Sequence, residues 1–392
     1  MLKPRFALAL MNRISNRHLA VALAAIALSS GCRRENAVTT IGGGQSTTKS
    51  VIPGVGYAMP AKGDKYEVVD IITDNKDPAL AKSNPEQALV AHPDLKCMVG
   101  LWAYNPPAIL SAIEGRGLGD RVKIVGFDET AETLNGIADG KIVGTVAQRP
   151  YYFGYKSVEY LAAMARGQDV DIPENKIVYV PHTVVTAENI QQFKADTEAI
   201  LAGNGPELPP DRDYQTDQSV QLLLITNSID PFWVLCQKGV EKANGVFNAN
   251  CRVAMPSNAT VEQQKIEIEQ FINNNGQGLA ISPINGANQA EMINRAAEAM
   301  PVICQDADSP TSNRRFYLGT NNYLAGRDVG KLVKQAIPEG GKVALFVGKL
   351  EVSNAQERSR GVIDELLDKP IPEAYRTRSD EEAVTAAEPQ GN

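Results

Sequence analysis

The sequence predicts an α/β fold built from two doubly wound parallel sheets. From residue 66 onward, short β-branched runs alternate with amphipathic stretches, the pattern of strand–helix–strand units that form parallel sheets. The alternation occurs in two series, one ending near residue 186 and one starting near residue 219. With 392 residues, 43% of them hydrophobic and 22% charged, the chain can bury the cores of two lobes.

The first 31 residues have the three regions of an export signal. Basic residues precede an apolar run at 19–28, which is too short to span a bilayer comfortably, and small residues at 29–31 lead to Cys32. This order resembles a bacterial lipobox, whose cysteine is acylated, although Ser29 replaces the usual aliphatic residue. Ordinary cleavage without lipid is the alternative. We expect an exported protein of the periplasm or cell envelope, anchored to a membrane by lipid at Cys32, with 32–61 as a linker.

The first series supplies four strands and four helices. Its β-branched runs predict strands at 66–72, 96–102, 123–127 and 142–147. Its amphipathic stretches predict helices at 85–91, 106–114, 129–138 and 152–166, followed by an extended segment at 176–185. A polar stretch rich in glycine and proline at 187–218 reads as a surface connection, with a helix near 191–201.

The second series starts afresh and ends in an acidic tail at 371–392. Strands are predicted at 220–226, 252–255, 278–282, 302–305, 316–319 and 342–347. Helices are predicted at 232–244, 261–273, 287–299, 325–336 and 354–367. The last helix lacks a following strand, and 66–72 is the spare one. We therefore predict that 66–72 pairs with 342–347 in one sheet.

Composition excludes several functions. A net charge of −7 and a pI near 5.3, with no basic stripe, argue against a nucleic-acid partner. None of the three histidines has a metal-ligand neighbour at helical or turn spacing, so we expect no metal and no cofactor. Beyond Cys32, the cysteines do not form a disulfide framework, and we expect four core thiols: Cys97, Cys236, Cys251 and Cys304.

Polar and aromatic side chains directly follow several predicted strands. Ligands of doubly wound sheets bind beyond the carboxyl ends of the strands, so these positions are candidates for a site. The candidates are Asp230, Phe232, Trp233, Asp306, Asp308, Trp102, Asn105, Asp128 and Gln148, with Arg358 at the start of the helix after 342–347. Carboxylates, amides and a guanidinium bind hydroxyls, and aromatic faces cover C–H surfaces, which suits a neutral sugar.

Each candidate also has an ordinary structural interpretation. Phe232 and Trp233 could anchor a helix to its sheet. Asp230, Asn354 and Asp128 could be helix N-caps. Arg358 could pair on the surface with Glu357 or Glu351. Their joint position at strand ends favours a pocket.

The chain resembles type I periplasmic sugar-binding proteins of the ribose and galactose class, over most of residues 64–370. The resemblance is carried by Asp230-Pro231-Phe232-Trp233, Gly319-Thr320-Asn321-Asn322, Asn354-Ala355-Gln356-Glu357-Arg358, His92-Pro93-Asp94, Val125-Gly126-Phe127-Asp128 and Ala147-Gln148. It implies a two-lobed fold, and it adds Asn75 and Asn354 to the ligand-binding residues. Two positions depart from the ribose binders: Ala307 replaces a sugar-bonding arginine, and Trp102 replaces an asparagine.

The resembling segments stand in an unusual order, which implies a circular permutation. Residues 62–186 match the closing half of the fold, including one helix at 151–167 that belongs to the N-terminal lobe. Residues 219–370 match the opening half, and 187–218 would join the old termini. We expect the chain to cross between lobes near 148–151, 167–176 and 320–323.

Four functions follow from these observations. The first is a monomeric receptor that closes around a monosaccharide and delivers it to the permease of an ABC importer. The second is a glycoside hydrolase that uses Asp230, Asp306 or Asp308 as acid and base. The third is a sugar-responsive repressor. That function requires a basic DNA-binding helix, which this sequence does not show. The fourth is a sensor that presents the sugar to a membrane receptor, which the sequence does not separate from import.

Overall fold

The computed structural model describes residues 50–258 and 260–376. The predicted export signal, Cys32, most of the linker and most of the acidic tail lie outside the described residues.

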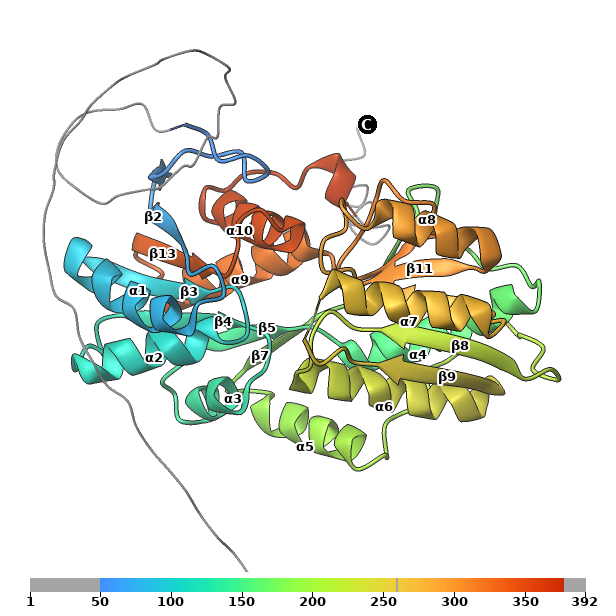
Figure 1. The fold of residues 1–392 in the computed structure, drawn as a ribbon. Coiled ribbons are helices and arrows are strands. Elements are labelled where there is room, and N and C mark those ends of the chain that lie inside the picture. Colours follow the sequence, from blue (N-terminus) through green and yellow to red (C-terminus); the bar gives the residue numbers. More distant parts are fainter. Residues whose placement is uncertain (1–49, 259, 377–392) are drawn as a thin grey trace, which may run out of the picture. The chain divides into compact units, whose positions relative to one another are not determined.

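The described residues form two sheets (Figure 1). In spatial order, the first sheet contains β1 (Ala61–Lys62), β2 (Tyr66–Thr73), β13 (Gly341–Val347), β3 (Leu95–Gly100), β4 (Lys123–Phe127), β5 (Gly144–Ala147) and β7 (Thr183–Thr186). The second contains β6 (Ile177–Tyr179), β12 (Tyr317–Gly319), β11 (Val302–Gln305), β10 (Gly278–Ile281), β8 (Val220–Ile225) and β9 (Ala249–Ala254). Most pairs are parallel; β1–β2 and β5–β7 are antiparallel. The predicted α/β class is confirmed.

Helices connect the strands. They are α1 (Pro78–Ala91), α2 (Asn105–Gly115), α3 (Ala131–Ala138), α4 (Pro150–Ala165), α5 (Ile190–Leu201), α6 (Pro231–Val246), α7 (Val261–Asn273), α8 (Ala290–Ala299), α9 (Asn322–Ala336) and α10 (Ser353–Leu366), followed by a 3-10 turn at Glu373–Tyr375. The predicted helix near 191–201 is thus confirmed as α5.

Strand β13 lies between β2 and β3, although it comes from the other end of the described chain (Figure 1). It pairs in parallel with β2 from Gly341 opposite Tyr66 to Val347 opposite Thr73, with one register shift after Val343. The predicted pairing of these two distant segments is confirmed. Counted from β13, strands β13, β2, β3, β4 and β5 lie in the spatial order 2-1-3-4-5. Strands β8 to β12 lie in the same order, that of a doubly wound sheet.

The chain passes between the two sheets at three places within the described residues. It passes from β5 to α4 at Gln148 and Arg149, from β6 to β7 at 180–182, and from β12 to α9 at Thr320 and Asn321. Helix α4 then packs on α6, and α9 packs on α10. The predicted crossing at 167–176 is wrong. The extended segment at 176–185 is two strands rather than one: β6 pairs with β12 in the second sheet, and β7 pairs with β5 in the first.

Of the element boundaries that differ from the prediction, two follow from a cap and from strand pairing. Helix α1 begins at Pro78 rather than at Pro85, since Asp77 caps it by accepting bonds from the amides of Ala79 and Leu80. Pro85 then lies inside the helix. Strand β9 begins at Ala249 because it pairs with β8 over its whole length, from Val220 opposite Ala249 to Ile225 opposite Ala254.

Apolar residues fill both faces of each sheet. Cys97, Cys236, Cys251 and Cys304 are buried free thiols within these cores, as predicted. Within the described residues, no helix has the length and hydropathy that a membrane crossing needs.

Candidate functional site

Arg358 is the buried centre of the candidate residues. Its side chain is 3% exposed, and its guanidinium carbon lies 3.7 Å from the centre of the Phe127 ring. Its Nε donates to Oδ1 of Asn322 at 2.8 Å, and its Nη1 donates to the carbonyl of Leu101 at 3.0 Å. Arg358 is therefore no surface ion-pair partner, and the ordinary interpretation of it is wrong.

Asp128 directly follows strand β4 and faces this arginine. Its Oδ2 lies 3.9 Å from Nη1 of Arg358, and its Oδ1 accepts a bond from Nε2 of Gln148 at 2.9 Å. The φ of 63° at Asp128 turns the chain sharply after the strand, and aspartate tolerates this left-handed conformation better than most residues. Thr130, and not Asp128, caps α3. Burial raises the pKa of Asp128, although Arg358 and Gln148 oppose the shift.

Asp306 is the counterpart of Asp128 at the end of β11 in the second sheet. It has the same left-handed turn, with φ 60°, and its carboxylate accepts a bond from Oγ of Ser282 at 3.2 Å. Burial raises its pKa to about 6, with Arg358 lowering and Asp128 raising it. Asp128 and Asp306 thus follow strands of different sheets, and both Asp128 and Arg358 contribute to the pKa of Asp306.

Asp230, Phe232 and Trp233 open α6. Asp230 is its N-cap and accepts the amide of Phe232 at 2.9 Å and the hydroxyl of Ser228 at 2.5 Å. Trp233 is 1% exposed, and its Nε1 donates to Ser228 Oγ at 3.1 Å. Its indole therefore belongs to the core that packs on the second sheet. Phe232 is only partly buried and packs edge-on against Trp233 and Phe153.

Two predicted residues carry buried polar atoms that have no hydrogen-bond partner among the described residues. They are Nε1 of Trp102, after β3, and Oδ1 of Asn354, in the first turn of α10. Val352, and not Asn354, caps that helix. Buried polar atoms in folded proteins nearly always have a hydrogen-bond partner. The lack of one makes both atoms candidates for contact with a ligand. Asn75 is exposed in the turn after β2, at φ 56°, and its amide donates to the carbonyl of Gly348 at 2.8 Å.

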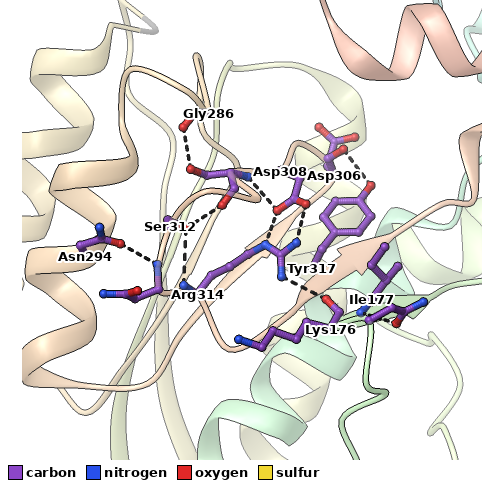
Figure 2. A network of polar contacts seen from close by, with 12 residues as sticks. Lys176, Ile177, Gly286, Asn294, Asp306, Asp308, Ser312, Arg314 and Tyr317 are labelled. Carbon is purple, nitrogen blue, oxygen red and sulfur yellow. Dashed lines mark hydrogen bonds and ion pairs between the residues drawn. The ribbon is translucent and has the colours of Figure 1, made fainter. Parts of the chain in front are cut away.

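Asn105 and Asp308 are engaged in holding turns. Nδ2 of Asn105 donates to Asp74 Oδ2 at 3.0 Å, and its Oδ1 accepts the amide of Trp102 at 3.0 Å. Figure 2 shows Asp308 held by the fork of Arg314, with Nη2 to Oδ2 at 2.6 Å and a second bond from Nε. Arg314 also donates to the carbonyl of Lys176 at 3.0 Å.

Sequence reasoning missed three polar residues of this cluster. Asn227 is the second residue after β8 and Ser282 directly follows β10, and Nδ2 of Asn227 donates to Oγ of Ser282 at 2.9 Å. The strand-end rule would have found both. Lys76, beside Asn75, places its Nζ 5.2 Å from the centre of the Trp102 ring. Burial and then Lys349 lower the pKa of Lys76, whereas Asp306 and Asp230 oppose this.

The described residues contain no group of three histidine, cysteine or acidic side chains that could hold a metal ion. What the cluster offers is a set of directional donors and acceptors beside partly buried aromatic rings. Such a set can bind a small polyhydroxylated molecule.

Comparison with known proteins places the chain beside solute-binding proteins. The sequence model of the family described as "Periplasmic binding protein domain" matches residues 42–169 and 220–388. The ribose import binding protein RbsB of Salmonella typhimurium is 28% identical over 117 residues, which cover 30% of this chain and 39% of that protein. The xylose/arabinose-binding protein XylF of Sulfolobus acidocaldarius is 24% identical over 144 residues, covering 34% and 36%.

The matched region thus spans about two fifths of the length of these curated relatives. Among solved structures, an ABC transporter solute-binding protein from Burkholderia graminis, in complex with D-arabinose, is 30% identical. That match covers 38% of this chain and 53% of the other, with a TM-score of 0.36.

Proposed function

Because the chain belongs to the family of periplasmic binding protein domains, we propose that it is the solute receptor of a sugar ABC importer. It binds one monosaccharide, a pentose or a hexose, between the carboxyl edges of its two sheets. The family is one of binding proteins, so we expect no catalysis. The sequence relatives, which are named for ribose and for xylose or arabinose, support a sugar of this size.

One contact carries the proposal: Nη1 of Arg358, on α10, lies 3.9 Å from Oδ2 of Asp128, which follows β4 in the first sheet. Asp306, which follows β11 in the second sheet, opposes together with Asp128 the lowering of the Arg358 pKa by burial. A buried guanidinium beside a carboxylate has donors for ring and hydroxyl oxygens, and carboxylates accept from hydroxyls. The unpartnered atoms of Trp102 and Asn354 add one donor and one acceptor. These groups together match the alternating donors and acceptors of a sugar.

The ligand set that we propose is smaller than the twelve residues expected from sequence. Asp128, Asp306, Asp230, Arg358, Asn354, Trp102, Gln148, Asn75 and Phe232 remain candidates for direct contact. Trp233 supports Phe232 from the core, and Asn105 and Asp308 hold the turns on which the candidates stand. Lys76 joins the set at the rim of the site.

Binding would proceed by rotation of the two lobes about the three crossings described above. A sugar that contacts both edges favours the closed arrangement by its extra contacts, and the closed surface is what a permease recognises. Import and sensing share this binding step. The protein would act as an exported monomer, held at a membrane by lipid at Cys32 or released after ordinary cleavage.

The segment order is explained by a circular permutation of the family's fold. The family match is interrupted between residues 169 and 220. In the 2-1-3-4-5 order of its sheet, β13 has the position of strand 1, although it comes late in the chain. Both observations support a permuted order in which 187–218 joins the former ends.

Isothermal titration calorimetry against ribose, arabinose, xylose, allose, galactose and glucose tests the proposed function. We expect one of them to bind with a Kd in the micromolar range or below, that is, at least about 8 kcal/mol. Absence of heat with every sugar, together with release of reducing ends from an oligosaccharide, would instead favour the hydrolase with Asp306 or Asp230 as the acid.

A further inference from the structure

A cavity of about 480 Å³ lies against helix α5 and adjoins the cluster described above at Gln148. Its walls are α5 and the turn after it, the crossing from β5 into α4, and Leu235 at the start of α6. Helix α5 contacts α3 and α6. On the α3 side, Nζ of Lys194 donates to Oδ1 of Asn135 at 2.8 Å. On the α4 side, the hydroxyl of Tyr151 donates to the carbonyl of Pro206 at 2.7 Å. The volume is within the range of small-molecule sites.

Glu129 lines this cavity, and one of its carboxylate oxygens lacks a hydrogen-bond partner. Its Oε2 is buried and accepts no hydrogen bond from the described residues. An unbonded buried carboxylate oxygen is costly, which makes it a strong acceptor for a donor that reaches it. Burial, reinforced by the adjacent Asp128, raises the pKa of Glu129, and this shift is in the direction expected for a carboxylate without a counter-charge.

The nearest wall cation does not supply that counter-charge. Nε of Arg149 donates to Oγ1 of Thr183 at 2.9 Å, and its guanidinium carbon lies 5.1 Å from the centre of the Tyr152 ring. No ion pair within 4 Å joins Arg149 to Glu129 in the described part of the chain. Asp196 on α5 is a second acid in the wall. The cavity therefore has acceptors in excess of cations.

The rest of the wall is largely apolar. Phe193, Ala199 and Ile200 come from α5, and Pro150 and Leu235 from the opposite side. A ligand that fits both the apolar wall and the Glu129 carboxylate has a compact apolar body and one positively charged donor.

A second cavity, of about 580 Å³ on the other side of Tyr151, offers a contrast. Its charged side chains are already paired: Lys238 bonds Glu241 at 2.9 Å, and Lys242 bonds Glu207 at 3.0 Å. That cavity presents no unsatisfied group and needs no ligand.

We propose that the cavity against α5 is a second binding site, which takes a small organic ammonium ion and binds its charged group to Glu129. This site adjoins the proposed sugar site, since Gln148 lines the cavity and donates to Asp128.

Ligand-observed NMR titration of the full chain at about pH 8 tests the proposal, with benzylamine as the probe and benzyl alcohol as its neutral counterpart. We expect benzylamine to bind with a millimolar Kd, at least about tenfold more tightly than benzyl alcohol. Glu129→Gln should remove this preference. The control Glu132→Gln, an exposed acid on α3 that does not line the cavity, should keep it.

Equal binding of the two probes, or an unchanged preference in Glu129→Gln, would overturn the proposal. So would displacement of benzylamine by a monosaccharide that binds the chain, because the amine would then occupy the sugar site. If Glu129→Gln fails to fold, the amide shifts of Phe193 and Thr197 in the unaltered protein decide the question. They must move with benzylamine and stay in place with benzyl alcohol.

Discussion

The guanidinium of Arg358 and the carboxylate of Asp128 lie 3.9 Å apart, too far for a hydrogen bond and close enough for strong attraction. Arg358 comes from α10 near the end of the described chain, and Asp128 directly follows β4 in the first half of the chain. They meet because β13, which precedes α10, is in the same sheet as β4. A hydroxyl placed between them could accept from the arginine and donate to the aspartate.

Replacing Asp128 by alanine should weaken sugar binding by about 2 kcal/mol, because Arg358 and the ligand hydroxyl would both lose a partner. Calorimetry with the best sugar of the panel measures this, and thermal unfolding shows whether the variant is folded. Glu132→Gln, nearby on α3 and exposed, is the control and should bind normally. Unchanged affinity in Asp128→Ala would remove Asp128 from the site.

Trp102→Phe and Trp233→Phe should have opposite effects. The indole nitrogen of Trp102 has no partner in the described protein, so its loss should cost sugar affinity about tenfold and leave stability nearly unchanged. The indole nitrogen of Trp233 bonds Asn227 and Ser228, so its loss should lower the free energy of unfolding by about 1 kcal/mol. Calorimetry and urea unfolding of both variants separate the two roles. Equal loss of affinity in both would contradict this division.

Asp306 should make stability fall as pH rises from about 4 to 6. Burial raises the pKa of Asp306 to about 6, so the folded protein holds this proton more tightly than the unfolded chain, whose aspartates titrate near about 4. Below about pH 4 the residue is protonated in both states and the cost vanishes; above about pH 6 the full cost of the buried charge is present.

Asp306→Asn removes this titration. Relative to the unaltered protein, its free energy of unfolding should rise by about 1 to 2 kcal/mol between about pH 4 and pH 7.5, after allowance for screening of a partly exposed carboxyl. Urea unfolding of both proteins across this range gives the difference. Glu357, whose pKa burial raises to about 7, contributes equally to both proteins and cancels. A difference independent of pH would show that Asp306 has an ordinary pKa.

Much of the fold was predictable from the sequence, because buried parallel strands are continuous apolar runs that need no tertiary information to recognise. The pairing of β13 with β2 was predictable because a helix without a following strand and a strand without a preceding helix complete each other. The split of 176–185 into β6 and β7 was not. Both strands are short and β-branched, and only their neighbours in space decide which sheet each one joins.

The strand-end rule located the site but not the work of each side chain. It selects Asp306 and Asp308 alike, since both follow β11. Only the fold brings Arg314 to Asp308 and leaves Asp306 beside Ser282. In the same way, the burial of Trp233 depends on helix α4, which follows β5 of the first sheet and packs on α6 beside the second. Lys76 was missed because its proximity to Trp102 depends on a turn with two consecutive left-handed residues, Asn75 and Lys76.

Asp308→Ala should destabilise the protein by about 3 kcal/mol, because it leaves the 6% exposed Arg314 buried without a counter-charge. Arg314→Leu in the same chain should recover part of this loss, since no isolated charge then remains. Urea unfolding of the two single variants and the double variant gives the coupling energy. Sugar affinity, measured where all are folded, should change less than in Asp128→Ala. Additive losses in the double variant would contradict a supporting ion pair.

A chain that starts at Asp217, continues to Arg376, passes through a short glycine–serine linker to Ser50 and ends at Thr216 should fold and bind the same sugar. The segments near the two joined ends pack on the neighbouring helices α9 and α10. Tyr57 bonds Asp364 of α10, and Tyr375 stacks on Tyr323 of α9 with ring centres 4.2 Å apart. Tyr323 in turn donates to Asp364 at 2.8 Å, so a short linker suffices.

The new ends, at Thr216 and Asp217, fall in an exposed connection. Folded proteins tolerate new termini at such places when the two ends that the linker joins are close together. We expect a free energy of unfolding within about 2 kcal/mol of the original and the same preferred sugar. As a control, a chain reopened between Leu223 and Leu224, inside the buried strand β8, should fail to fold. If the chain that starts at Asp217 also fails, the present order of segments is required for folding, and the circular permutation loses its support.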